Sequence, residues 1–388
     1  MAVYLDHNAT TALDEGVLEA MLPYLRNHYG NPSSAHSLGR PARGAINKAR
    51  EQLAELVNAA PEQIIFTSGG TEANNLALKG ALSGSPAGGR FAISAIEHAS
   101  LRGPAQALAG QGWQLDTIAV DKQGRVSLDD VQTALTHNPR LVSIMLGNNE
   151  TGVLQDIAGI NKCIKNAATI FHTDAVQALG KIKVDFAASG AHLMSLSAHK
   201  IYGPKGIGAL VMDKAIAMEP LLHGGAHERG KRAGTENVAA IVGFGAAAQL
   251  VRTELAQRQA HWLELRNYLM ARLRELPGVV IFAEQAEHLP NTVLISVPQF
   301  QGETLLAGLD QAGFMLSSGS ACTSGNLAPS HVLVAMGVEP HLLRNVLRIS
   351  LGKDTTRAEL DQFLAALHRL MAQCSPWQPK TRAGNIPI

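Results

Sequence analysis

Short apolar runs rich in β-branched residues alternate with longer amphipathic stretches along the first two-thirds of this 388-residue chain. The amphipathic stretches Thr71–Leu82, Ala99–Gln111 and Leu128–Thr136 predict helices between several of these runs. Strands that alternate with helices predict a parallel or mixed sheet covered by helices on both faces, with ligands at the carboxyl ends of the strands. The runs that we interpret as strands are Gln63–Thr67, Arg90–Ala95, Leu115–Val120, Leu141–Leu146, Thr169–Thr173, His192–Leu196 and Gly208–Met212.

The pattern changes near Thr235, where two long helical stretches begin and short strands and helices follow. Pro277-Gly278 ends the second helical stretch. We therefore predict an α/β fold with a large, mixed, mostly parallel sheet domain over residues 15–255 and a smaller α+β domain formed by residues 1–14 and 256–388. The elements expected in this part are helices at Glu236–Leu250, Thr253–Leu276, Glu303–Gly313 and Arg357–Gln373, and strands at Val279–Phe282 and Asn291–Val297.

Composition argues against several classes of protein. Hydrophobic residues make up 46% of the chain, which suffices for a sizeable core and is too much for a disordered protein. The net charge is +1 without long runs of one sign, so we expect no direct binding of nucleic acid or membrane. Cys163, Cys322 and Cys374 lack the paired spacing of a disulfide framework or metal site. We predict a cytoplasmic protein, because no signal peptide or bilayer-length apolar run is evident.

A glycine-containing turn follows the first predicted strand of the sheet, in the sequence Thr67-Ser68-Gly69-Gly70-Thr71-Glu72-Ala73-Asn74-Asn75. The two glycines permit a sharp turn, and the helix that begins there offers free N–H groups and a positive dipole end. A phosphate is a suitable ligand, with the Thr71 hydroxyl as a further donor. The alternative is a plain strand–turn–helix in which Thr71 caps the helix. The motif is not a Walker loop, because no Gly-Lys-Ser/Thr follows.

A carboxylate and a lysine follow two later strands, in His172-Thr173-Asp174-Ala175-Val176-Gln177 and Ser195-Leu196-Ser197-Ala198-His199-Lys200. At these strand ends both side chains would point into one crevice. Lys200 is then suited to a Schiff base and Asp174 to a pyridinium nitrogen. The alternatives are a helix cap for Asp174 and a solvated charge for Lys200, and Lys205 competes as the reactive lysine.

Taken together, the motifs resemble those of the NifS/IscS cysteine desulfurases, a branch of the class-V aminotransferase-like enzymes with the fold-type-I architecture of pyridoxal-phosphate (PLP)-dependent transferases. The resemblance runs from residue 4 to about residue 352. Single motifs are weak evidence, but this many in one order are strong. The motifs are YLDHNATT, GNPSSAH, TSGGTEANN, EH, NNETG, HTDAVQ, SLSAHK, RAGTEN and SSGSACTS.

The resemblance implies that PLP is the cofactor and assigns residues to it. Lys200 would hold the cofactor and then act as general base and acid, Asp174 would pair with the ring nitrogen, and His98 would stack on the ring as a further catalytic residue. Thr235 would reach the phosphate of the neighbouring subunit, which requires a homodimer; a surface turn is the alternative. The remaining cofactor contacts implied are Gln177 at the ring hydroxyl oxygen, Asn149, and Gly70, Thr71, Ser197 and His199 at the phosphate.

Arg348 is implied to bind the substrate carboxylate with help from Asn149. It lies inside an apolar alternating run, Leu347-Arg348-Ile349, where a charge is costly unless it is paired. Arginine matches a carboxylate with two parallel hydrogen bonds. The alternative is a structural salt bridge.

Among the class-V enzymes that the sequence resembles, Cys322 indicates one particular activity. It lies in the small, polar stretch Ser317–Gly325, whose composition suits a mobile loop rather than a core. A thiolate there could take the sulfur of bound L-cysteine, which gives L-alanine and an enzyme persulfide for a protein sulfur acceptor such as an iron–sulfur scaffold. We expect no resident metal, although Cys322 could transiently ligate an iron–sulfur cluster. The alternatives are a selenocysteine lyase, another class-V PLP aminotransferase, or a scaffold protein that has lost catalysis.

Overall fold

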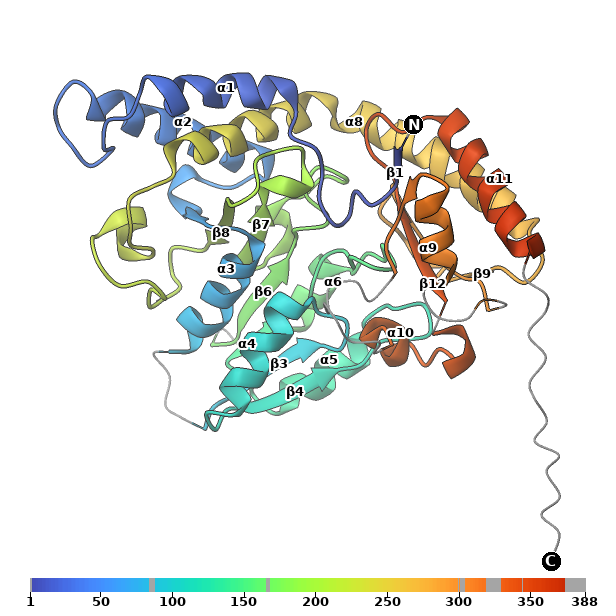
Figure 1. Cartoon of the computed structure of the whole chain (residues 1–388). Helices are drawn as coiled ribbons and strands as arrows, with labels where there is room; N and C mark the ends of the chain where they lie inside the picture. The colour runs from blue at the N-terminus through green and yellow to red at the C-terminus, as the bar shows by residue number, and fades with distance from the viewer. Residues whose placement is uncertain are drawn as a thin grey trace, which may run out of the picture.

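The computed structural model describes residues 2–83, 88–164, 168–298, 300, 304–318, 329–343 and 345–373. Cys322 and Cys374 lie outside these residues. A central sheet with helices on both faces adjoins a smaller group of strands and helices that contains both ends of the described chain (Figure 1).

Within the described residues the central sheet has seven strands, in the order β2-β8-β7-β6-β5-β3-β4. β8 runs antiparallel to both of its neighbours, and all the remaining pairs of neighbouring strands are parallel. The predicted large, mixed, mostly parallel sheet is confirmed, and each strand overlaps an apolar run interpreted as a strand. The strands are β2 (Ile64–Thr67), β3 (Arg90–Ser94), β4 (Gln114–Ile118), β5 (Leu141–Ser143), β6 (Ile170–Asp174), β7 (Leu193–Ser197) and β8 (Gly208–Met212).

Alternate residues of each strand pack against helices on opposite faces of the sheet. On one face, Phe66, Leu196 and Val211 contact the helices α2 (Gly39–Leu56) and α8 (Val238–Arg274). On the other face, Phe91 and Ile93 pack against α3 (Gly70–Asn75) and α4 (Ala99–Ala109). Four further helices lie on the same face as α2 and α8: α1 (Glu15–Arg26), α5 (Leu128–Thr136), α6 (Ile157–Cys163) and α7 (Phe186–Ser189).

The helix that opens at Gly70 is less regular than expected. Thr71–Leu82 was predicted as one α-helix, but α3 ends at Asn75 and continues as a π-helical turn over Leu76–Gly80. Single π-helical turns inside helices often lie near functional sites.

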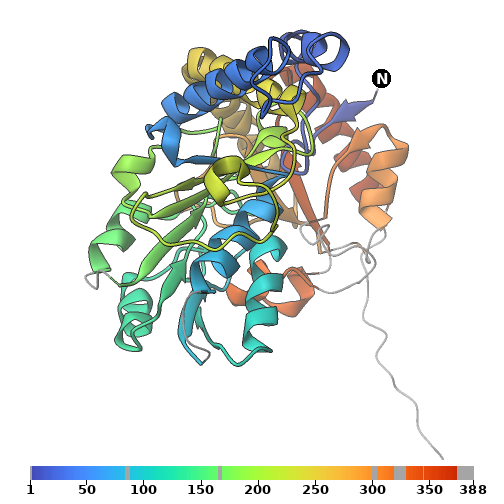
Figure 2. The same cartoon turned by 90° about the vertical axis from the view of Figure 1, so that its left-hand side faces the viewer.

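The helix α8 corrects the prediction of two helices at Glu236–Leu250 and Thr253–Leu276. It is continuous over 37 residues, from Val238 to Arg274, and crosses the domain boundary expected at residue 255. By length and composition alone it could cross a membrane. In the fold it lies beside α1 and α2, and its apolar face is buried from Ala239 to Leu273 (Figures 1 and 2).

The smaller group of elements forms around the second half of α8. Its core includes Trp262, Leu269, Ile295 and Phe363. The N-terminal strand pairs in parallel with β11, so the start of the chain packs beside its last third (Figure 2). The strands are β1 (Val3–Tyr4), β9 (Val280–Ile281), β10 (Thr292–Ser296), β11 (Phe314–Met315) and β12 (Val346–Ser350), and the helices are α9 (Thr304–Gln311), α10 (His331–Ala335) and α11 (Arg357–Gln373).

Candidate active site

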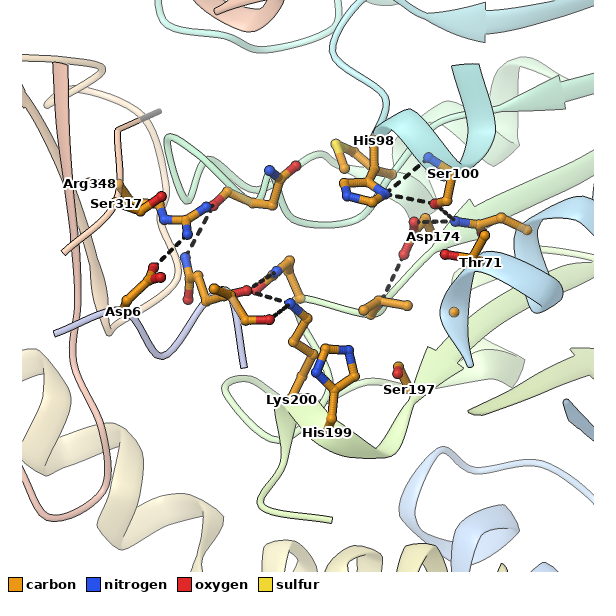
Figure 3. A pocket seen from close by; sticks show the side chains of 18 residues that line it. Asp6, Thr71, His98, Ser100, Asp174, Ser197, His199, Lys200, Ser317 and Arg348 are labelled. Atoms are coloured by element: carbon orange, nitrogen blue, oxygen red, sulfur yellow. Dashed lines mark hydrogen bonds and ion pairs between the residues drawn. The ribbon is translucent and has the colours of Figure 1, made fainter. Parts of the chain in front are cut away.

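A cavity of about 490 Å³ lies at the carboxyl ends of β6 and β7, which end at Asp174 and Ser197. Arg348 and Asp6 lie at one side of it, Thr71 and Asp174 at the other, and His98 lies opposite Lys200 (Figure 3). Apart from Thr235, every predicted site residue within the described part of the chain lines this cavity. These residues are Gly70, Thr71, His98, Asn149, Asp174, Gln177, Ser197, His199, Lys200 and Arg348.

Asp174 is buried and held by two donors. Its Oδ1 accepts from the backbone N–H of Val176 at 2.9 Å, and its Oδ2 accepts from Nδ2 of Asn74 at 2.7 Å. Each carboxylate oxygen has a second lone pair. Asp174 can therefore accept a further proton donor from the cavity, as a protonated ring nitrogen requires.

A directed chain of hydrogen bonds joins Asp174 to His98. Nδ2 of Asn74 also donates to Oγ of Ser100 at 2.8 Å, which leaves the Ser100 hydroxyl to donate to Nδ1 of His98 at 2.7 Å. The backbone N–H of Ser100 donates to the same nitrogen at 3.1 Å. Because Nδ1 accepts both, the neutral His98 ring carries its proton on Nε2.

The surroundings of His98 favour its neutral form. Burial is the largest influence that lowers its pKa; Asp174 opposes the shift, and the charges of Lys200 and Arg348 add to it. The preceding residue, Glu97, fixes the turn that carries this histidine: its Oε1 accepts from Oγ of Ser94 at 2.6 Å and from the backbone N–H of Met145 at 2.7 Å. A neutral imidazole can lie against an aromatic ring without the cost of a buried charge.

Lys200 lies in a 3₁₀ turn, Ala198–Lys200, that directly follows β7. Its Nζ donates to the backbone oxygens of Asn8 at 2.5 Å and Ala9 at 2.7 Å. The N-terminal segment thus forms one wall of the cavity and orients the amine. Lys205, the competing lysine, does not line this cavity but an adjoining hollow.

The opposite end of the cavity can hold an anion. Ser197 is fully buried, and its Oγ has no hydrogen-bond partner among the described residues. A Cβ at Gly70 would lie only 2.9 Å from Cγ2 of Val176, so glycine keeps this end open. Burial, with the charges of Lys200 and two further lysines, lowers the pKa of His199 to about 4. The residues present therefore fit a phosphorylated pyridine, with its phosphate beside Gly70, Thr71, Ser197 and His199.

Arg348 forms a buried ion pair and also borders the cavity. It is 2% exposed, and its Nη2 forms an ion pair with Oδ1 of Asp6 at 2.6 Å. Its Nη1 donates to the backbone oxygen of Asn149 at 3.1 Å, and its Nε has no partner among the described residues. The structural salt bridge exists, and the guanidinium still lines the cavity with donor capacity left for a carboxylate.

Thr235 and Cys322 lie outside this arrangement. Thr235 lines a separate hollow of about 250 Å³ together with Ser68 and Arg232. Cys322 is not among the described residues, but Ser317, five positions before it, lines the cavity. The chain segment that carries Cys322 therefore starts at the cavity wall.

Several cavity residues were missed from the sequence. Asp6 and Asn8 belong to the YLDHNATT motif, and Asn74 lies three positions after Thr71, on the same face of a helix. Both motifs had been singled out, so the spacing could have indicated Asn74. Ser317 likewise opens the SSGSACTS motif, whereas Ser100 gave no comparable signal.

Comparisons with known proteins agree with this geometry. The family described as Aminotransferase class-V matches residues 3–363. A cysteine desulfurase IscS of Dictyoglomus turgidum is 42% identical over 386 residues, which cover 99% of this chain and 98% of that protein. Among solved structures, a NifS-like protein matches with a TM-score of 0.90 and 37% identity over 96% of this chain and all of its own. SspA in complex with cysteine matches with a TM-score of 0.80 and 31% identity over 91% of this chain and 100% of its own.

Proposed function

Because the chain belongs to the class-V aminotransferase family, we propose that it is a PLP-dependent cysteine desulfurase that places the sulfur of L-cysteine on Cys322. The observation that carries the proposal is the convergence of Lys200, Asp174 and Arg348 on one cavity. The cysteine bound in the related SspA structure supports L-cysteine as the substrate.

Bound PLP supplies an electron sink for the bonding electrons of the substrate α-carbon. Asp174 would hold a proton at the ring nitrogen, and Gln177 would donate to the ring oxygen. His98, whose pKa is lowered mainly by burial, would lie against the ring. Lys200 would hold the cofactor and later move the proton at the α-carbon, for which its place at the cavity wall is suited.

Arg348 would bind the carboxylate of the substrate. Its guanidinium is fixed by Asp6 and by the Asn149 carbonyl, so little conformational entropy is lost on binding. A substrate carboxylate held there would leave the α-carbon inside the cavity that Lys200 also lines (Figure 3).

The Cys322 thiolate would then attack the substrate sulfur. A sulfur–sulfur bond forms, the bond between the sulfur and the β-carbon breaks, and its electron pair leaves with the carbon, which is protonated to give L-alanine. A fully extended chain covers at most about 14 Å over the four residue steps from Ser318 to Cys322. A thiol reductant in the assay releases the sulfur as sulfide and is itself oxidised.

The test is the substitution Cys322→Ala in the cofactor-loaded enzyme. We expect the variant to keep the PLP absorbance, since no described cofactor contact changes, and to lose sulfide release from L-cysteine. Cys163→Ala is the matched control, because Cys163 lies at the end of α6, away from the cavity, and should retain activity. Full sulfide release by Cys322→Ala would refute the persulfide on Cys322.

We also propose a homodimer in which Thr235 reaches the partner's phosphate site. Thr235 does not line the cavity of its own chain. A hollow of about 380 Å³ that includes Gly70, Thr71 and His199 adjoins the phosphate end and leaves room for such a contribution. Exposed apolar side chains support a partner surface: Tyr29 is 79% exposed, and Leu38 and Leu222 are about half exposed.

Mixed dimers test this proposal. Lys200→Ala and Thr235→Ala subunits should each form weakly active or inactive homodimers. In a mixed dimer, the Thr235→Ala subunit has its own Lys200 and the partner's Thr235, so one intact site per dimer is restored. We expect recovery of up to about half the activity of the unaltered enzyme after subunit exchange. No recovery in verified mixed dimers would show that Thr235 serves its own chain.

The names of the relatives support a proposal for the destination of the sulfur. Their IscS names support delivery to a protein acceptor in iron–sulfur cluster assembly, and we propose this role, in the cytoplasm, for the chain described here. Transfer of radiolabelled sulfur from L-cysteine to a purified scaffold protein, lost in Cys322→Ala, is the corresponding measurement.

A further inference from the structure

Lys181 is a buried lysine that the reaction described above does not use. It is 3% exposed, in a turn shortly after β6, and it does not line the cavity. Among the residues that the structure describes, no carboxylate lies within ion-pair distance of its amine. A buried lysine without a carboxylate is costly, and such a residue calls for an explanation.

The amine of Lys181 contacts two side-chain amides. Its Nζ donates to Oε1 of Gln177 at 2.7 Å and to Oδ1 of Asn8 at 2.8 Å. An amide can present either its oxygen or its nitrogen to a neighbour, whereas a lysine amine that donates both bonds requires an oxygen. Lys181 therefore favours one orientation of each amide; at Asn8 it shares this role with Asn291, whose Nδ2 donates to the same Oδ1 at 3.1 Å.

The consequence for Gln177 is that its nitrogen is directed away from Lys181. Nε2 donates one hydrogen to the backbone oxygen of Asn8 at 2.9 Å, the same oxygen that accepts from Nζ of Lys200. The second hydrogen of Nε2 remains for a group in the cavity, which Gln177 lines.

We propose that Lys181 is a positioning residue that holds the Gln177 amide with its nitrogen available to the ring oxygen of the cofactor. The inference rests on the proposed cofactor role of Gln177. The amide of Asn8 is held in the same way: its Nδ2 donates to the backbone oxygen of Asn149 at 3.3 Å, and that oxygen also accepts from Arg348. The amine of Lys181 thus contacts an amide on the cofactor side and, together with Asn291, an amide next to the substrate side of the cavity.

The charged surroundings agree with an amine that acts as a donor rather than as a counter-ion. Burial, followed by the charges of Lys200 and Arg348, lowers the pKa of Lys181 well below its ordinary value. The other titratable groups that sense Lys181 are His7 and His199, and burial lowers the pKa of each to about 4.

The test is the pH titration of the absorbance of the cofactor-loaded protein. A donor at the ring oxygen stabilises the negative charge that this oxygen carries once the nitrogen joined to Lys200 has lost its proton, and so lowers the observed pKa. In Lys181→Met the Gln177 amide is free to turn. We expect the observed pKa to rise by about half a unit to one unit, the effect of one lost hydrogen bond. Lys183→Met, at a lysine whose side chain is 81% exposed, is the control and should leave the titration unchanged.

A double substitution separates positioning from a direct effect of charge. Gln177→Leu should raise the observed pKa by itself, and Lys181→Met should add little in that background, because its effect passes through Gln177. Equal shifts in both backgrounds, or no shift in Lys181→Met, would overturn the inference. If Lys181→Met does not fold, Lys181→Gln keeps a donor without the charge, and a shift as large as that of Gln177→Leu would overturn it.

Failure of the inference can be told apart from failure of the proposed function. An unaltered protein that takes up no PLP would contradict the proposed function. A protein that binds PLP, and whose titration ignores Lys181, would contradict only the role of this lysine.

Discussion

At the scale of the residue, a group that can only donate a hydrogen bond fixes its neighbour in the role of acceptor. The backbone N–H of Ser100 can only donate, and it therefore places the His98 proton on Nε2. The chain from Asn74 through Ser100 to His98 propagates that choice, because each member donates onward. The imidazole that faces the cavity is thus ordered before any ligand binds, as preorganised catalysis requires.

The first prediction at this scale concerns the Ser100 hydroxyl. Ser100→Ala removes one of the two donors to Nδ1 of His98 and leaves the backbone donor in place. We expect PLP to be retained and kcat for sulfide release to fall about fivefold, the equivalent of about 1 kcal/mol for one hydrogen bond. Ser83→Ala removes a hydroxyl that does not line the cavity and should have no effect. An unchanged kcat in Ser100→Ala would contradict the importance of the chain.

At the scale of the element, strand ends explain which catalytic residues could be found from the sequence. Asp174 directly ends β6, and Lys200 lies three residues after β7, so the apolar runs alone placed both at one edge of the sheet. Asp6 and Asn8 could not be placed in this way. They belong to an irregular segment whose position depends on pairing between β1 and β11, more than 300 residues apart in the chain, and periodicity carries no information about such a contact.

The helix α8 shows why element boundaries were harder to predict. Its first half is buried between α1, α2 and the large sheet, and its second half covers the small sheet, so the apolar pattern changes near residue 252 without any break in the backbone. No glycine or proline lies at that point. The glycines of the first half serve packing: a Cβ at Gly243 would lie 2.6 Å from Sδ of Met21, and one at Gly245 would lie 2.6 Å from Cα of Ala49.

At the scale of the whole molecule, the cavity walls come from residues 6 to 348 of the chain. The sheet edge supplies Asp174 and Lys200, and the smaller group of elements supplies Arg348, which is locked to Asp6 by an ion pair. The large sheet with its helices and the smaller group of elements share α8 and the N-terminal segment. Loss of tertiary structure anywhere along α8 or the N-terminal segment therefore disrupts the site. Global stability and its pH dependence are therefore functional properties of this enzyme.

Buried titratable groups set the direction of that pH dependence. Burial lowers the pKa of four imidazoles that lie away from the phosphate end to about 3 or 4. In the unfolded chain these imidazoles have pKa values near 6.5, so below that pH they bind protons that they do not bind in the folded protein. The free energy of unfolding therefore falls as the pH decreases below 6.5. Two buried carboxyls, Glu97 with its pKa raised to about 8 and Glu150 with its pKa raised to about 7, act in the opposite direction but are fewer. The imidazoles are those of His7, His172, His288 and His331.

We therefore expect the free energy of unfolding, measured by guanidinium denaturation, to decrease from pH 6.5 to pH 4.5, and His172 to account for a definable part of the decrease. His172 is fully buried on β6, between the hydroxyls of Ser143 and Ser195, and burial lowers its pKa to about 3. His172→Gln retains a side chain that can hydrogen-bond both serines but cannot be protonated. It should therefore reduce the slope of the free energy of unfolding against pH by up to about 1.4 kcal/mol per pH unit. His368→Gln, on the exposed face of α11, should leave the slope as it is. A slope that is equally steep in His172→Gln would mean that this imidazole is protonated in the folded protein, and that burial does not govern its charge.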